Sequence, residues 1–180
     1  MWRWTWRTCS AFRFPPHLIA NQVRRYLDSL ELLALTIEGA AACAAPRISQ
    51  EALQAVREDI RRLWNEDYLY GHTPALLLDL IIKHAGMDAL NGVYALLRRN
   101  FRIGRSIPVL LDTRKTAVNR SIHGQCVEAV ELLAGGDRAA FARQAAAAFQ
   151  SIHHLVIESC RRLGYYEAAM GAYDGSALRK

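Results

Sequence analysis

The sequence QVRRYLDSLELLALTIEGAAACAAP, residues 22–46, carries a helical pattern long enough to indicate the fold class of the whole chain. Apolar side chains recur along it at alternating steps of four and three residues, the period of one face of an α-helix. Further leucines lie off that face. We therefore expect a helix that either sits centrally in a bundle or contacts a second subunit, and that Pro46 ends. The stripe consists of Val23, Leu27, Leu30, Ala34, Ile37, Ala41 and Ala44, with Leu32, Leu33 and Leu35 beside it.

The rest of the chain repeats this helical period. No window alternates with period two over a useful length, and no hairpin dipeptide joins two strand-like runs. We therefore predict an all-α antiparallel bundle of about six helices. In the second helix, Arg57 and Arg61 are expected to face water. The second helix is expected to begin after the cap Ser49 and the third at Thr73-Pro74. The fourth is expected over 88–101, the fifth over 110–133 and the sixth after the cap Asp137.

The chain of 180 residues, 52% of them hydrophobic, suits one cored domain with short ends. We divide it into a basic Trp- and Arg-rich lead, 1–22, expected to be disordered, a helical domain, 23–163, and a C-terminal tail, 164–180. The formal charge is +6, but five of the 23 Lys and Arg side chains lie in the first 27 residues, which contain no Asp or Glu. The body is therefore nearly neutral, which argues against a nucleic-acid-binding face.

Several classes of protein are disfavoured by what the sequence lacks. The four cysteines form no Cys-x-x-Cys pair, no stretch approaches the roughly 18 apolar residues of a membrane span, and the N-terminus has no secretory signal. We expect reduced thiols, a cytoplasmic location and no membrane association. Phosphate-binding loops, nucleophile elbows and zinc-protease motifs are missing too, so we predict neither enzyme activity nor a cofactor.

Histidines are the most concentrated source of chemistry in the chain. His123 shares a helix face with Asn119, one turn earlier, and with apolar residues. It is either a core histidine whose hydrogen bonds are satisfied internally or a polar group lining a ligand cavity. His153, on an apolar face of the last long helix, has the same two interpretations. Arg98 belongs to an arginine run that either faces solvent or contacts an anionic ligand.

Three stretches carry motifs in a recognisable order. LLALTIEGAAACAAPRISQEALQAV, 32–56, has Ile37-Glu38, Ala-rich turns and an Arg-x-Ser break. LLLDLIIKHAGMDAL, 76–90, ends in a glycine turn. IHGQCVEAVELLAGGDRAAFARQAAAAF, 122–149, joins a His-containing helix to an Ala-rich one through Gly-Asp. Together they resemble the C-terminal, FCD-type ligand-sensing domain of GntR-family transcriptional regulators of the FadR branch. The resemblance covers about residues 23–163 and implies a helical bundle that dimerises and encloses a small-molecule effector cavity.

The resemblance implies a site as well as a fold. It suggests an organic acid or acyl-type effector, bound in a cavity lined by Asn119 and His123, with Tyr94 and Arg98 as polar anchors and His153 as a further candidate.

Many members of the family bind a divalent metal in that cavity through four side chains. The matching positions here are Pro74, Leu78, His123 and Ala148. Of these, only histidine is a residue type that ligates metals. Because a zinc-type site needs at least three protein ligands, the resemblance implies a metal-free cavity.

GntR regulators contact DNA through an N-terminal winged helix-turn-helix, which needs about 60 residues or more. The 22 residues before the first bundle helix are too few, so we expect DNA contact only through a domain that this chain lacks. We predict an effector-sensing and dimerisation domain of a GntR-type regulator, acting as a homodimer. A helical protein-interaction module and a TetR-like ligand domain are the alternatives.

Overall fold

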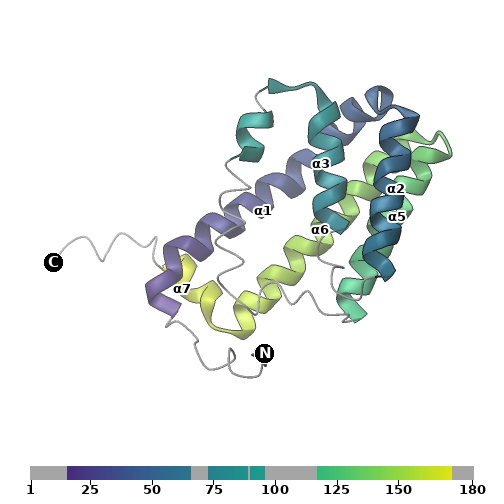
Figure 1. The fold of residues 1–180 in the computed structure, drawn as a ribbon. Coiled ribbons are helices and arrows are strands. Elements are labelled where there is room, and N and C mark those ends of the chain that lie inside the picture. Colours follow the sequence, from purple (N-terminus) through teal and green to yellow (C-terminus); the bar gives the residue numbers. More distant parts are fainter. Residues whose placement is uncertain (1–15, 66–72, 89, 96–116, 172–180) are drawn as a thin grey trace, which may run out of the picture.

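Two long antiparallel helices organise the computed structural model, which describes residues 16–65, 73–88, 90–95 and 117–171. They are α1, Pro16–Ala44, and α6, Arg138–Arg162, and they pack along each other (Figure 1). With a rise of 1.5 Å per residue, the 29 residues of α1 span about 43 Å. The described residues contain helices and no strand, which confirms the predicted all-α class.

The remaining helices cover the two ends of this pair (Figure 1). At one end, α3, Thr73–Ala85, packs against α1, and α5, Ala117–Ala134, packs against α6. The helix α2, Gln50–Asn65, lies against both α3 and α5. At the other end, the short helix α7, Tyr165–Gly171, packs on α1. A 3-10 helix, η2, Ala45–Arg47, follows α1, and residues 90–95 are helical.

The core has two parts because the long helix pair is covered separately at each end. The larger cluster joins the second half of α1 to α2, α3, α5 and the first half of α6. The smaller cluster joins Val23, Tyr26 and Leu27 of α1 to the end of α6 and to α7. None of the described helices has both the length and the hydropathy needed to cross a membrane.

The predicted stripe of α1 forms its buried face. All its residues are buried except Ala34, which is half-buried, and Leu33 is buried beside them. The other two leucines point outward, since Leu32 is 40% exposed and Leu35 is 77% exposed. Within the protomer, α1 is therefore buried along one broad face and leaves two leucines exposed on its outer side.

Ser49 and Asp137 cap the starts of two helices, and glycines follow the ends of two others, where the sequence predicts. The Ala52 N–H donates to Ser49 Oγ at 3.1 Å, and the Ala140 N–H donates to Asp137 Oδ1 at 2.9 Å. Gly86 after α3 has φ +64° and Gly136 after α5 has φ +88°, a left-handed conformation that glycine adopts without a steric cost.

The packed structure extends beyond the predicted domain limits, 23 and 163, at both ends. The helix α1 begins at Pro16, inside the predicted lead, because proline suits the first turn of a helix. Within the predicted tail, α7 buries Tyr165 and Ala169. This single i,i+4 pair is too short a pattern to identify a helix from sequence. Residues 96–101 and 110–116 of two predicted helices lie outside the described residues.

Candidate functional site

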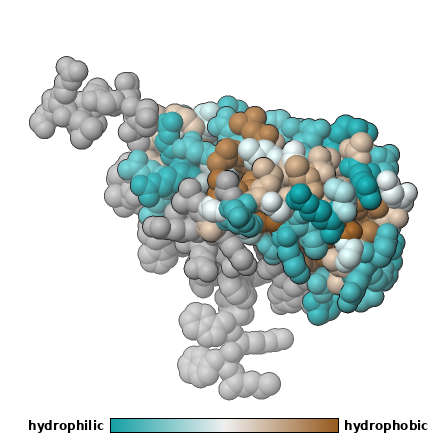
Figure 2. All heavy atoms as spheres, turned by 90° about the horizontal axis from the view of Figure 1, so that it is seen from above, coloured by the Kyte–Doolittle hydropathy of each residue, from teal (hydrophilic) through white to brown (hydrophobic). Residues whose placement is uncertain are grey.

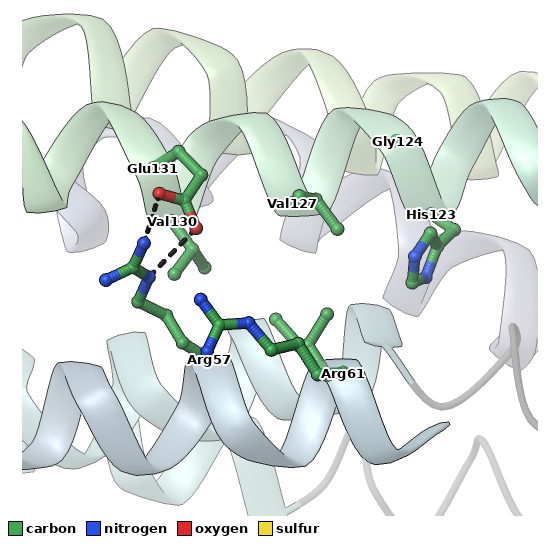
Figure 3. Close-up of a pocket in the computed structure, with 8 residues that line it drawn as sticks. Arg57, Arg61, His123, Gly124, Val127, Val130 and Glu131 are labelled. Atoms are coloured by element: carbon green, nitrogen blue, oxygen red, sulfur yellow. Dashed lines mark hydrogen bonds and ion pairs between the residues drawn. The ribbon is translucent and has the colours of Figure 1, made fainter. Parts of the chain in front are cut away.

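A groove of about 480 Å³, partly open to solvent, lies between α2 and α5 (Figure 3). This volume is in the range of small-molecule sites, and the lining is mostly apolar, as in such sites. The helix α2 contributes one wall with i, i+3, i+4 spacing, so its three lining side chains share a face. The lining residues are Arg57, Ile60 and Arg61 from α2, and His123, Gly124, Val127, Val130 and Glu131 from α5.

His123 lies at one end of this groove and joins α5 to α3. Its side chain is buried, 4% exposed, and its Nδ1 lies 2.8 Å from Oγ1 of Thr73, in a hydrogen bond whose direction depends on the imidazole tautomer. Thr73, at the start of α3, is fully buried. Burial lowers the pKa of His123, because the charged imidazolium loses hydration inside the protein. The ring is therefore neutral at pH 7.

Arg57 and Glu131 form an ion pair at the other end of the groove (Figure 3). Arg57 Nε donates to Glu131 Oε1 at 2.9 Å and Nη2 donates to Oε2 at 2.7 Å, so the pair is bidentate and joins α2 to α5. Arg57 was expected to face water, and its side chain is partly exposed; the carboxylate that α5 places opposite it was not predicted. Since both side chains are partly exposed, at 27% and 49%, such a pair contributes at most about 1 kcal/mol to stability.

Arg61 is the second cation of the groove. Its side chain is exposed, as predicted, and makes no hydrogen bond or ion pair with any residue that the structure describes. Figure 3 shows its guanidinium reaching into the space between the two helices, on the side of Arg57. With Arg57 neutralised by Glu131 and His123 neutral, the lining carries a net charge of one positive unit.

Of the five predicted effector-binding residues, the described lining of the groove includes His123 alone. Asn119 lies in α5 one turn before it, but the Asn119 side chain and the whole of Arg98 lie outside what the structure describes.

Two of the predicted effector-binding residues lie away from the groove. The Tyr94 hydroxyl donates to the carboxylate of Asp79 on α3. His153 is half-buried on α6, and its ring stacks on that of His154 with 6.1 Å between centroids. Burial lowers the pKa of His153, an effect that the nearby Glu31 carboxylate opposes and His154 reinforces. The structure therefore does not bring Tyr94 or His153 together with His123.

The sequence did not identify four further features of the site. Three belong to the groove lining, namely Arg61, Gly124 and the Arg57–Glu131 pair, and the fourth is Thr73, which bonds to His123. Thr73 was identified only as a helix start, and the arginines only as a solvent face. Arg57 and Glu131 are 74 residues apart, and local periodicity does not show which helices become neighbours. The one local signal was Gly124 next to His123, a glycine inside a helix.

The described cysteines, Cys43, Cys126 and Cys160, form no disulfide. Burial raises the pKa of the Cys126 thiol to about 12. Burial and, secondarily, the Glu167 carboxylate raise that of Cys160 to about 11. Neither is a thiolate at neutral pH, so neither is a nucleophile. Over the described part of the chain, no three His, Cys, Asp or Glu side chains come together as metal ligands would.

No protein-family model matches this chain, and none of the curated proteins or solved structures compared with it is significantly similar. The resemblance to GntR-family regulators stays a prediction carried by the sequence motifs.

Proposed function

We propose that this chain is a small-molecule sensing and dimerisation domain of the kind that GntR-family regulators carry. The observation that supports the sensing role is the groove between α2 and α5, where the buried His123 lies beside an apolar lining. A ligand site needs a few polar groups among apolar ones, and the groove offers this combination.

The contacts around the groove suggest how binding could alter the protein. A ligand there touches α2 and α5 together, and the Thr73–His123 hydrogen bond connects α5 to the start of α3. A ligand that prefers one arrangement of these helices shifts the population toward it. Because α3 packs on α1, a change in the arrangement of α2, α3 and α5 also changes the packing of the long helix pair.

The dimerisation role is supported by the outer face of α1. The helix α1 exposes Leu32 and Leu35. Figure 2 shows one face of the molecule, on which hydrophobic residues lie among hydrophilic ones. One turn after Leu35, a Cβ on Gly39 would meet no atom within 4 Å. A two-fold axis that passes between positions 35 and 39 would place Leu35 of one copy against Gly39 of the other, and a large side chain against a small one would make the contact self-complementary.

A thermal-shift panel of organic acids, fatty acids and acyl-CoAs tests the sensing role. A ligand that binds only the folded state at 100 times its Kd stabilises it by about 2.7 kcal/mol, which raises the Tm by several degrees. We expect at least one member to do so, and His123→Leu to abolish the response. His154→Leu is the matched control, because His154 is exposed and lies outside the groove lining.

A flat response to the whole panel would contradict the proposal, and a His123→Leu variant more stable than the wild type would point the same way. His123 would then be a packing residue, and a helical interaction module would be the better hypothesis.

A further inference from the structure

Two features of the groove say what kind of ligand it suits. The first is its charge. Two arginines point into the groove. One of them, Arg57, is neutralised, because it donates two hydrogen bonds to the carboxylate of Glu131. Arg61 has no such partner among the described residues, although its guanidinium lies in the same space (Figure 3). A planar guanidinium is suited to bidentate contact with a carboxylate. The groove therefore has one unmatched positive charge.

The second feature is Gly124, which lies inside α5 on the groove side. A glycine in a helix interior is unfavourable relative to alanine, because it loses more backbone freedom on folding. Here packing inside the protein gives no reason for it, since a Cβ at this position would meet no atom within 4 Å. A glycine leaves the helix backbone open to close approach, and a ligand is one of the groups that uses such an approach.

The apolar part of the lining lies between these polar groups. Ile60 of α2 and Val127 and Val130 of α5 make up this apolar lining. His123 and Glu131 lie at its two ends (Figure 3). Eight residues separate His123 from Glu131, which gives a length of about 12 Å along α5. The apolar side chains of this space suit an elongated apolar chain, and Arg61 lies beside them (Figure 3).

We propose that the groove binds an amphiphile with a single anionic head group, a monocarboxylate with an apolar chain. Its carboxylate contacts Arg61, its chain lies over Ile60 and Val127, and it passes directly over the backbone at Gly124 toward His123. Arg61 selects for one negative charge, and Gly124 provides the room. This inference rests on the proposed function, because it names the ligand class of the same groove.

Calorimetry on the full chain tests the charge requirement with octanoate as the probe. Octanamide has the same chain without the charge, and suberate adds a second carboxylate at the far end. We expect octanoate to bind at least about tenfold more tightly than octanamide, since a hydrogen bond to a charged group is worth that much or more. Suberate should also bind more weakly than octanoate, because its second carboxylate would lose hydration against the apolar lining. Octanesulfonate, another monoanion, separates carboxylate recognition from charge alone and should bind more weakly than octanoate.

Two pairs of variants locate the site. Arg61→Gln should weaken octanoate binding about tenfold, whereas Arg62→Gln should not, because Arg62 pairs with Asp59 and lies outside the groove lining. Gly124→Leu should abolish binding while the protein stays folded, because leucine favours helix and meets open space. Gly92→Leu is its control, since Gly92 is also helical and unobstructed but does not line the groove.

The outcomes separate this inference from the function on which it rests. If octanamide binds as tightly as octanoate, or if Arg61→Gln binds octanoate like the wild type, the inference is overturned and the sensing role stands. If Gly124→Leu binds octanoate normally, the ligand lies elsewhere and the inference is again overturned. If no compound of the thermal-shift panel binds at all, both fail.

Discussion

The buried imidazole of His123 gives the protein a pH dependence whose sign follows from its surroundings. Burial lowers the pKa of this side chain below the ordinary value of 6.5. As the pH falls through 6.5, the unfolded chain takes up a proton that the folded chain does not, so the free energy of unfolding decreases. The decrease ends once the pH is below the folded pKa. Arg57, Arg61 and Glu131 are the charged groups of the lining that it shares.

We predict that His123→Gln reduces this acid sensitivity. Glutamine can still form a hydrogen bond with Thr73 but does not titrate, so the variant should lose less stability than the wild type between pH 8 and pH 5. Urea unfolding at a series of pH values measures the difference. His154→Gln is the control. It lies outside the groove lining and should change the pH dependence only through the neighbouring His153, whose pKa His154 lowers, so the effect of burial at His123 stays. Equal pH slopes for His123→Gln and the wild type would show that His123 is protonated equally in both states.

His123 also shows how far the sequence could predict the site. Its place on a mixed polar and apolar helix face was visible in the periodicity, and it does lie on the groove. Its partner was not visible, because Thr73 is 50 residues away and was explained locally as a helix start. A side chain's own helix face can be inferred from local spacing, whereas the group opposite it depends on how the helices pack.

The end of α3 depends on a contact between two elements. Arg47 of η2 donates a hydrogen bond to the Ala85 carbonyl, one of the carbonyls that the last turn of a helix leaves without a partner. The next residue, Gly86, has φ +64°, and a Cβ there would collide with the Arg47 guanidinium. The turn therefore needs glycine for two separate reasons, its conformation and its contact with Arg47.

A double-mutant cycle separates these two reasons. Gly86→Ala should lower the free energy of unfolding by about 1–2 kcal/mol from the left-handed backbone alone, and by more when Arg47 is present. In an Arg47→Met background the cost should fall to the backbone part, because the colliding guanidinium is gone. Chemical denaturation of the four proteins measures the coupling. Additive costs would mean that Arg47 moves aside freely and does not hold the turn.

The end of α3 and the ends of its neighbours show which helix ends can be predicted from the sequence. Gly86 and the caps Ser49 and Asp137 act within a few residues, so local rules locate them correctly. The contact of Arg47 with Ala85 spans 38 residues and has no local signal. The helix α6 ends one residue before the predicted domain limit, 163, but α7 beyond it was missed, because two buried residues do not make a period.

In the whole molecule too, local patterns predict single helices, whereas contacts between distant helices have no local signal. The α1 pattern was enough to predict an all-helical chain, and its buried stripe is the one expected. The arrangement of α2 beside α5, which creates the groove, comes from packing among helices that are far apart in sequence. The prediction that α1 is apolar on a second side also has a consequence for the whole molecule. Leu35 at 77% exposure has no role within the protomer, and it lies one turn from an unobstructed Gly39.

We therefore predict that the chain, 20.2 kDa as a monomer, has twice that mass in solution and that the outer face of α1 is the interface. Leu35→Glu should give the monomer, because a carboxylate against the second copy would lose its hydration. Gly39→Leu should do the same without unfolding the protomer, since its side chain enters open space in one copy and collides only with the other. Met87→Glu is the control, a substitution of an exposed apolar residue elsewhere. Sedimentation equilibrium measures the mass: a wild-type monomer, or a Leu35→Glu variant that is still dimeric, would exclude this interface.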